Sequence, residues 1–158
     1  MTLLSPLILV VDDDDDDRLM LGQAFEEKAS ECRLAFVSDG TKCLEFLLEA
    51  TQFPALILMD LNMPGMNGIE VLSKLRATPQ WKKLPVVILS TSNSQEQINM
   101  AYQEGANSYI TKPNTFEDLA HMAGILCSYW LNLVKQPTLK NSLVPQIIPP
   151  GSRPMKTS

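Results

Sequence analysis

The chain has 158 residues, 45% of them hydrophobic and 20% charged, and this length is enough for one domain with a sizeable apolar core. The formal net charge of −5 argues against nucleic acid as a direct partner, because binding to phosphate backbones relies on clustered Lys and Arg. No apolar run approaches the roughly 20 residues that a membrane helix needs, so we expect no membrane segment and no membrane partner.

The first third of the chain alternates short apolar runs with helical patterns. Residues 7–11 predict a fully buried strand, and residues 19–29 carry apolar side chains at helical spacing. A second, weaker strand is expected over residues 33–37. It is followed by a helix over residues 41–49, for which Thr41 is the expected cap.

The same alternation continues to the end of a long last helix. The predicted elements are a strand at 55–59, a helix at 68–77, a strand at 86–89, a helix at 94–103, a strand at 108–111 and a helix from Thr115 to about Val134. Strands that alternate with helices predict an α/β fold, in which a parallel sheet has helices on both faces. Prolines interrupt any regular pattern after residue 134, so we expect one domain over residues 1–134 and a Pro-rich apolar extension over residues 135–158.

Polar side chains that could carry chemistry follow directly on the predicted strands. They are Asp12 and Asp13 after the first strand, Asp60 after the third, Ser90 and Thr91 at the end of the fourth, and Lys112 after the fifth. In open parallel sheets, ligands bind at the carboxyl ends of the strands. The sequence therefore predicts one site at this edge of the sheet.

Asp12 opens a run of six aspartates that ends at Asp17. Such runs usually form a solvated face, and we assign that role to residues 14–16, whereas Asp17 could cap or charge-complement the next helix. Asp12 and Asp13 are expected to be held at the sheet edge, where packed carboxylates repel one another unless a cation such as Mg²⁺ offsets their charge. Asp60 could be an ordinary turn residue or, facing a metal, a nucleophile toward phosphorus.

The hydroxyl and ammonium groups are weaker signals when each is taken alone. Ser90 and Thr91 could donate to a phosphoryl oxygen, but such residues more often cap the next helix. Lys112 could pair with a phosphoryl oxygen, although a single Lys is usually a surface charge. Pro113 raises the chance of a cis peptide bond that would aim Lys112 into the site.

The chain also contains three cysteines, which are Cys32, Cys43 and Cys127. Their number is odd and no pair has CxxC spacing, so we expect buried free thiols and a protein of the reducing cytoplasm.

Four motifs together resemble the receiver domains of two-component response regulators, over about residues 7 to 134. The matching stretches are Val-Val-Asp12-Asp13, Asp60-Leu-Asn-Met-Pro-Gly-Met-Asn-Gly68, Pro85-Val-Val-Ile-Leu-Ser90-Thr91 and Gly105-Ala-Asn-Ser-Tyr109-Ile-Thr-Lys112-Pro113. The resemblance implies a doubly wound, CheY-like and flavodoxin-like sheet of five parallel strands in the order 2-1-3-4-5. Residues 1–134 would then be the receiver domain, and the extension carries no effector domain.

The resemblance also implies a role for each matching residue. Asp60 would be the phosphoacceptor, and Asp12, Asp13, Asp60 and the backbone carbonyl of Asn62 would bind Mg²⁺. Ser90, Thr91 and Lys112 would contact the phosphoryl group, and Tyr109 would move as Ser90 moves, in a population shift of a two-state element. Ser90 stands where Thr is more frequent, and Ser92 is small and neutral at a place that often tunes dephosphorylation.

The implied function is that of a single-domain phosphoprotein of signal transduction, and not of an enzyme. Its phosphoryl donor would be the phosphohistidine of a sensor histidine kinase or of a relay protein. The run from Asp12 to Arg18 also resembles a subgroup that includes regulators of bacteriophytochrome kinases, in which Pro often stands at the position of Asp15. The apolar last helix indicates a homodimer through the fourth helix, fifth strand and last helix with help from the extension, unless the extension folds back on its own helix.

Two alternatives come from other classes of protein. A phosphatase of the haloacid dehalogenase type would use Asp12 as nucleophile and Asp14 as acid and base, but it leaves the segment around Asp60 unexplained. A phosphorylation-independent interaction module would keep the fold without the chemistry, and the complete set of polar residues argues against it.

Overall fold

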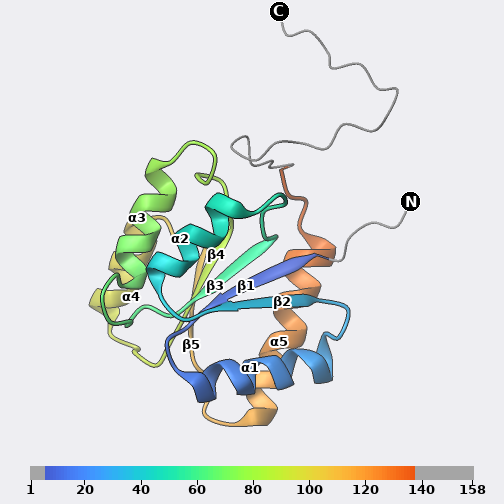
Figure 1. Cartoon of the computed structure of the whole chain (residues 1–158). Coiled ribbons are helices and arrows are strands. Elements are labelled where there is room, and N and C mark those ends of the chain that lie inside the picture. Colours follow the sequence, from blue (N-terminus) through green and yellow to red (C-terminus); the bar gives the residue numbers. More distant parts are fainter. Residues whose placement is uncertain (1–5, 138–158) are drawn as a thin grey trace, which may run out of the picture.

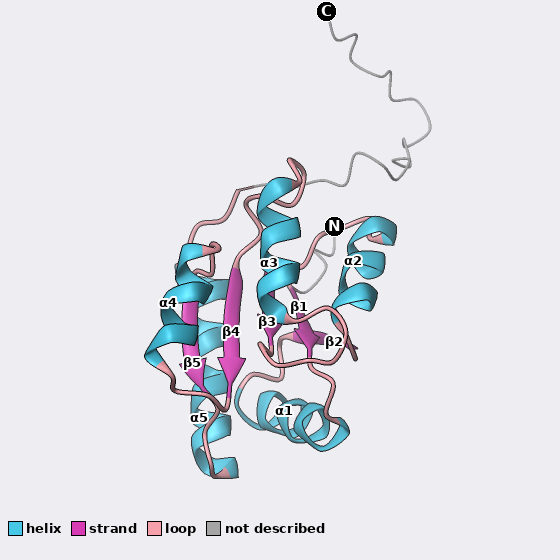
Figure 2. Cartoon of the chain, turned by 90° about the vertical axis from the view of Figure 1, so that its left-hand side faces the viewer, coloured by secondary structure: helices cyan, strands magenta, loops and turns pink. Residues whose placement is uncertain are grey.

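The computed structural model describes residues 6–137, which form a single five-stranded parallel sheet with helices on both faces (Figure 1). The strands are β1 (Leu7–Val11), β2 (Arg33–Val37), β3 (Leu56–Met59), β4 (Val86–Ser90) and β5 (Ser108–Thr111), and their order is β2-β1-β3-β4-β5. All four neighbouring pairs are parallel, and Figure 2 shows β4 and β5 side by side with their arrowheads pointing the same way. The predicted α/β class and the strand order implied by the resemblance are both confirmed.

Five α-helices connect or follow the strands. They are α1 (Asp15–Lys28), α2 (Gly40–Glu49), α3 (Gly68–Ala77), α4 (Gln95–Gln103) and α5 (Phe116–Cys127), and a π-helical segment, η1 (Ser128–Leu133), extends α5. Helix α1 begins at Asp15, earlier than the predicted start at Leu19. The Asp14 side chain accepts a hydrogen bond from the Asp17 backbone amide and caps the helix there. The predicted cap of α2 was wrong. Asp39, and not Thr41, has the extended backbone of a cap and accepts from the Lys42 amide.

Two apolar layers, one on each face of the sheet, form the core. Helices α1 and α5 pack on one face, where Phe25 and Leu126 meet inward-facing strand residues such as Ile8. Helices α2, α3 and α4 pack on the other face around residues such as Ile57 and Leu72. Because both faces are covered, the central strands are apolar on both sides, which is why they read in the sequence as continuous apolar runs.

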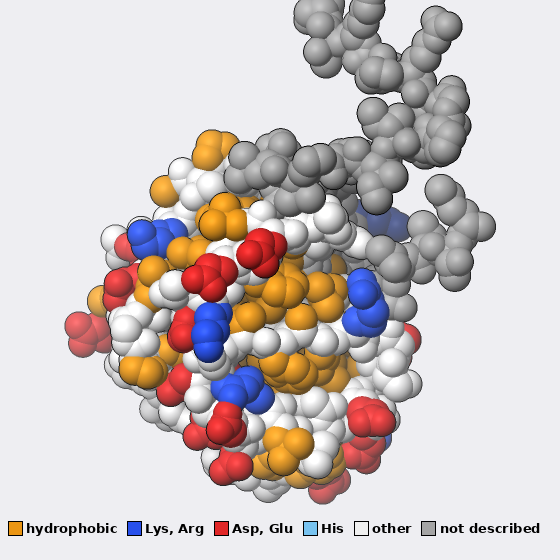
Figure 3. Space-filling model, viewed as in Figure 1, with side chains coloured by type: hydrophobic (Ala, Val, Ile, Leu, Met, Phe, Trp, Pro, Cys, Tyr) orange, Lys and Arg blue, Asp and Glu red, His pale blue; other side chains and the backbone are white. Residues whose placement is uncertain are grey.

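Strands β2 and β5 lie at the two edges of the sheet and are only partly covered. In Figure 3, apolar side chains gather at the centre of the face along which β2 runs, and 41% of Phe36 is exposed. The exposed edge agrees with the weaker strand pattern that the sequence has here.

The prediction of three free thiols was wrong for two of the cysteines. Cys32 and Cys127 form a disulfide, and Cys43 is free and buried. The pair is separated by 95 residues in sequence, so no local spacing reveals it. Cys32 directly precedes β2 and Cys127 ends α5, and the fold brings these two points together.

None of the helices within residues 6–137 combines the length and apolar character needed to cross a membrane. Residues 138–158, and with them most of the predicted C-terminal extension, lie outside the described residues.

Candidate functional site

The carboxyl edge of the sheet holds the buried polar side chains of the described chain. Within residues 6–137, the buried polar or charged residues are Asp12, Asp60 and Ser90, which are 2%, 9% and 0% exposed. They stand at the ends of β1, β3 and β4, the three central strands of the sheet. Burial of a charge is unfavourable unless it is paired, so this concentration at one edge marks a site built for a purpose other than stability.

Three carboxylates converge at this edge. Oxygen atoms of Asp12, Asp13 and Asp60 all lie within 4.8 Å of one another, with Asp13 exposed and the other two buried. Backbone amides hold two of them in place, because Asp14 N donates to Asp12 Oδ1 at 2.9 Å and Asn62 N donates to Asp60 Oδ1 at 3.3 Å. Such a set of hard oxygen donors, open to solvent on the side of Asp13, fits a Mg²⁺ ion that keeps several waters.

Lys112 brings a positive charge into the cluster. Its ammonium nitrogen lies 2.8 Å from Asp12 Oδ2, 2.7 Å from Asp17 Oδ2 and 3.6 Å from Asp60 Oδ2. Burial alone would lower the pKa of Lys112, but the hydrogen bonds with Asp12 and Asp17 and the charge of Asp60 outweigh burial and raise it above its usual value. The lysine is therefore a fixed positive charge at any pH at which the protein works.

Asp60 is in the opposite electrostatic situation. Burial raises the pKa of its carboxyl group, the charge of Lys112 only partly reverses this, and the neighbouring Asp12 raises the pKa further. An ionised Asp60 is thus a carboxylate whose negative charge is not fully compensated by its neighbours. A bound cation, or a bond to an electrophile, would reduce this excess negative charge.

The prediction of a cis peptide bond before Pro113 was wrong, because residues 6–137 contain no cis peptide bond. Lys112 reaches the carboxylates from a trans bond. Its backbone amide donates to the Ser90 carbonyl at 2.8 Å, which extends the pairing of β5 with β4 and fixes where the side chain starts. With this anchor in place, the lower-energy trans form suffices.

Asp17, the last residue of the acidic run, and Arg18, directly after it, have roles that the sequence did not reveal. Asp17 pairs with Lys112, whereas its position had suggested either a cap or a favourable interaction with the helix dipole at the start of α1. Arg18 donates to the Asp12 carbonyl oxygen at 2.5 Å and pairs with Asp15. A signal for Asp17 does exist, since a residue in the first turn after a strand-end carboxylate faces the same edge of the sheet.

Ser90 and Tyr109 are linked through Ser92. The Ser92 amide donates to Ser90 Oγ at 3.3 Å, and the Tyr109 hydroxyl donates to the Ser92 carbonyl at 2.7 Å. Tyr109 is half-buried and its backbone amide donates to the hydroxyl of Tyr102 on α4, while Thr91 is exposed. A displacement of Ser90 would therefore reach Tyr109 through a single residue.

The loop after Asp60 depends on two glycines. Gly65 has φ +74°, a left-handed conformation that favours glycine. At Gly68 a Cβ atom would lie 2.6 Å from the Asp60 carbonyl oxygen, so only glycine lets the start of α3 approach the end of β3 this closely. The Gly68 amide donates to the Leu61 carbonyl at 2.9 Å and closes the loop.

The comparison with known families identifies the class of protein to which this fold and this sheet edge belong. Residues 8–124 match the response regulator receiver domain, so the chain belongs to the response regulators of two-component signalling. The chain is 33% identical over 135 residues to the probable methanogenesis regulatory protein FilR2 of Methanothrix harundinacea, an alignment that covers 83% of this chain and 87% of FilR2.

Two solved structures are similar over almost their whole length. One is the phosphorylated cyanobacterial phytochrome response regulator RcpA, with a TM-score of 0.79, 29% identity and coverage of 85% of this chain and 100% of that chain. The other is the Mn²⁺-bound form of response regulator Rcp1, a protein of Synechocystis, with a TM-score of 0.75, 31% identity and coverage of 84% and 99%.

These findings argue against the alternative of a phosphatase of the haloacid dehalogenase type. It required Asp14 as acid and base, but Asp14 is exposed and its side chain caps α1. Membership of the receiver family also accounts for the segment around Asp60, which the hydrolase left unexplained.

Proposed function

We propose that this protein accepts a phosphoryl group on Asp60 from the phosphohistidine of a sensor histidine kinase or relay protein, and passes the signal on by a change of shape. The convergence of the Asp12, Asp13 and Asp60 carboxylates with Lys112 at one sheet edge carries the proposal. We further propose that it acts as a signalling protein whose only chemistry is self-catalysed phosphotransfer and dephosphorylation.

Asp12, Asp13 and Asp60, with the backbone carbonyl of Asn62, are the proposed holders of Mg²⁺. A bound Mg²⁺ would supply positive charge that reduces the repulsion between these carboxylates and the oxygens of an incoming phosphoryl group. The oxygen donors and their net negative charge fit this ion. The Mn²⁺-bound form of the similar Rcp1 is consistent with a divalent ion in such a pocket.

The chemical step is a displacement at phosphorus. A carboxylate oxygen of Asp60 attacks, a new O–P bond forms, and the P–N bond to the donor imidazole breaks, with the electron pair leaving on the imidazole nitrogen. Burial raises the pKa of Asp60, and a more basic carboxylate is the better nucleophile once ionised. Lys112, already 3.6 Å from Asp60 Oδ2, is positioned to take a phosphoryl oxygen as its partner.

The proposed switch consists of Ser90, Thr91 and Tyr109. The Ser90 and Thr91 hydroxyls would donate to the phosphoryl oxygens, and movement of Ser90 would reach Tyr109 through the hydrogen bonds that both make with Ser92. Phosphorylation then shifts the population of a two-state element, because the added charge interacts differently with its two positions.

The mass of the intact protein after treatment with acetyl phosphate tests the acceptor. We expect a gain of about 80 Da, the mass of one phosphoryl group, that requires Mg²⁺ and is lost in Asp60→Asn. Asp16→Asn is the matched control, since Asp16 is exposed in the same acidic run and lies outside the carboxylate cluster. A gain that persists in Asp60→Asn, or no gain in the wild type with Mg²⁺ bound, would contradict the proposal.

The donor that we propose is a phytochrome-type histidine kinase in the cytoplasm. RcpA is a cyanobacterial phytochrome response regulator, and the run from Asp12 to Arg18 suggested a subgroup that includes regulators of bacteriophytochrome kinases. We expect a purified phytochrome-type kinase loaded with radioactive phosphate to transfer it at least about tenfold faster than a sensor kinase without a photosensory domain. Equal rates from the two kinases would refute this assignment while leaving the acceptor role intact.

We also propose a homodimer through α4, β5 and α5. Large apolar side chains are partly exposed on this part of the chain, including Met100 and Tyr102 on α4 and Phe116 at the start of α5. Sedimentation should show a dimer at micromolar concentration that Met100→Glu weakens. Leu19→Glu, at a residue on α1 that is 61% exposed, should leave it unchanged. A monomer with and without phosphorylation would refute the dimer.

A further inference from the structure

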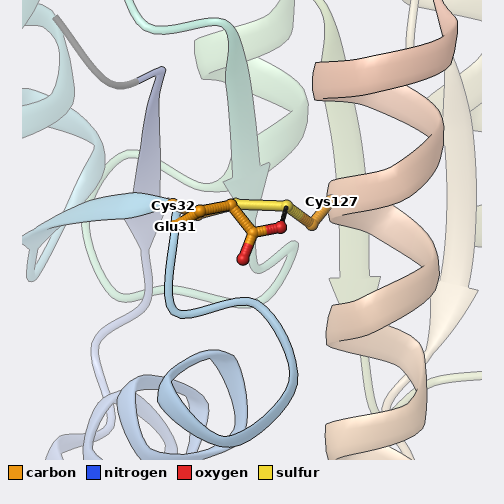
Figure 4. A group of neighbouring side chains, drawn as sticks. All are labelled: Glu31, Cys32 and Cys127. Carbon is orange, nitrogen blue, oxygen red and sulfur yellow. Dashed lines mark hydrogen bonds between the residues drawn. A yellow bond between two sulfur atoms is a disulfide. The ribbon is translucent and has the colours of Figure 1, made fainter.

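The amino edge of the sheet, opposite the proposed phosphoacceptor site, carries a second group of reactive side chains. Cys32 stands directly before β2 and Cys127 is the last residue of α5, and their sulfur atoms are bonded. Figure 4 shows the disulfide running from the loop before β2 to α5, with the Glu31 carboxylate beside it. Neither membership of the receiver family nor the proposed function makes use of these three residues.

Glu31 makes a contact that only the reduced cysteine can use fully. Its Oε1 lies 3.2 Å from Cys127 Sγ, which is within hydrogen-bonding distance for a thiol donor. The thiol has a hydrogen to donate to the carboxylate, and the disulfide has none. The reduced protein therefore gains a hydrogen bond between Cys127 and Glu31 that the oxidised protein lacks. This hydrogen bond stabilises the reduced form and favours a disulfide that can be reduced as well as formed.

The three side chains differ in their exposure to solvent, and the difference determines which cysteine a dissolved oxidant reaches first. Glu31 is exposed, Cys32 is half-buried and Cys127 is 2% exposed. Attack on a small oxidant would thus begin at Cys32, with Cys127 as the second, resolving thiol behind it. Cys43 contrasts with both, since it is fully buried and burial raises the pKa of its thiol to about 12.

The same three residues could in principle ligate a metal, but their arrangement does not favour one. A structural zinc site needs four ligands, and here three side chains converge. In the oxidised form the two sulfurs are bonded to each other, so neither is then available as a thiolate ligand.

We propose that Cys32 and Cys127 form a reversible oxidation site, which hydrogen peroxide closes to the disulfide and glutathione opens to the two thiols. The Cys32 thiolate attacks a peroxide oxygen, an S–O bond forms, the O–O bond breaks, and water leaves with a proton from the medium. Cys127 sulfur then attacks Cys32 sulfur, and the displaced hydroxide takes the Cys127 proton and leaves as water. The two thiols lose two electrons in all, and one peroxide becomes two waters. On reopening, one glutathione thiolate attacks a disulfide sulfur and a second displaces the first, so two glutathiones leave as glutathione disulfide and the two protein thiols regain two electrons.

Closure ties the C-terminal end of α5 to the start of β2. Helix α5 begins shortly after Lys112 and Pro113 at the carboxyl edge, so the disulfide fixes the far end of the element that follows the proposed site. Beyond Cys127 the chain continues as η1, where Tyr129 and Leu133 are 49% and 71% exposed. Oxidation would hold this apolar segment in one position, and reduction would release it.

The test uses the full chain, reduced and desalted, then treated with hydrogen peroxide, denatured and alkylated. Of the three cysteines, we expect the reduced protein to take up three labels and the oxidised protein one, on Cys43. Peptide mapping should find the cross-link between residues 32 and 127. Reduced glutathione should restore three labels, and the oxidised form should melt at least about 5 °C above the reduced form.

Three variants make the assignment specific. Cys32→Ser should abolish the cross-link and the melting difference, and Cys43→Ser should retain both. Glu31→Ala removes the acceptor of the thiol, so it should raise about threefold the ratio of reduced to oxidised glutathione at which half of the protein carries the disulfide. Glu31→Gln keeps an acceptor oxygen and should restore the wild-type ratio.

Three labels after peroxide, a disulfide that glutathione does not open, or cross-linked dimers as the sole product would each overturn the proposal. None of these measurements involves a phosphoryl group. A failed oxidation site and a failed phosphoacceptor are therefore distinguished, because acetyl phosphate labelling of Asp60 is measured separately on both redox forms.

Discussion

Lys112 is the cation around which the pocket carboxylates are arranged, so its removal tests the electrostatics of the site. Its ammonium nitrogen contacts Asp12, Asp17 and Asp60, and the lysine and Asp12 side chains are only 11% and 3% exposed. Lys112→Met keeps most of the apolar stem and removes the charge. The variant leaves buried carboxylates without their partner, and we expect it to be less stable than the wild type in the absence of metal.

The size of the effect follows from the two kinds of contact. At 2.8 Å and an effective dielectric constant of about 20, the attraction to Asp12 is about 6 kcal/mol before desolvation is subtracted. Removal of one partner from a buried pair destabilises proteins by about 3 to 5 kcal/mol. The Asp17 side chain is 40% exposed, so its pair adds at most about 1 kcal/mol. We therefore expect Lys112→Met to lower the free energy of unfolding by about 4 kcal/mol at neutral pH.

Urea unfolding of the metal-free protein measures this loss. Lys42→Met is the matched control, because Lys42 lies 4.0 Å from Asp39 with 59% of its side chain exposed and should contribute less than about 0.5 kcal/mol. The deficit of Lys112→Met should shrink as pH falls, since loss of the ammonium raises the pKa of Asp60 further and protonation then relieves the repulsion. A loss below about 1 kcal/mol, or one that does not depend on pH, would refute this account of the pocket.

Three further substitutions test other parts of the structure. Because burial raises the pKa of Asp60, the folded chain binds that proton more tightly and loses stability as pH rises between the unfolded and folded pKa values. Metal-free Asp60→Asn should thus unfold at higher urea than the wild type at neutral pH, and the gap should close near pH 3. Gly68→Ala puts a Cβ atom 2.6 Å from the Asp60 carbonyl oxygen and should slow labelling by acetyl phosphate at least about tenfold, with a loss of about 1 to 3 kcal/mol in urea. Arg76 donates to the backbone carbonyls of Gly105 and Leu84, so Arg76→Ala should lose about 2 to 4 kcal/mol, whereas Lys83→Ala, at an exposed residue, should lose less than about 0.5 kcal/mol.

The fold was predictable because each of its elements leaves a local signal. The three central strands are buried on both faces, so they appear as continuous apolar runs that end at polar residues. Asp12 and Asp60 stand at two of those ends, and Lys112 follows the edge strand β5. All three could be assigned to one edge of the sheet because parallel strands share their direction. Their convergence within a few ångströms follows from strand order and needs no further information from the sequence.

The features that sequence reasoning missed depend on distances between elements. Asp17 pairs with Lys112 across 95 positions, and the Cys32–Cys127 disulfide spans the same separation. In both cases α5 or the strand before it meets the region of α1, a packing that periodicity does not encode. The trans bond before Pro113 was missed for a different reason, since the backbone pairing of Lys112 with Ser90 already aims the side chain.

Helix α5 connects the two sites that the structure defines. It begins after the β5 residues that deliver Lys112 to the carboxylates, and it ends at Cys127, next to Cys32 at the other edge of the sheet. A helix held at its far end has less freedom to respond to a change at its near end, so closing the disulfide should reduce the motion that phosphorylation produces in α5 and η1. Hydrogen exchange of residues 116–133 measures this directly. If the phosphorylation-induced change is the same in the oxidised and reduced forms, the two edges act independently, and the oxidation site has no part in signalling through this helix.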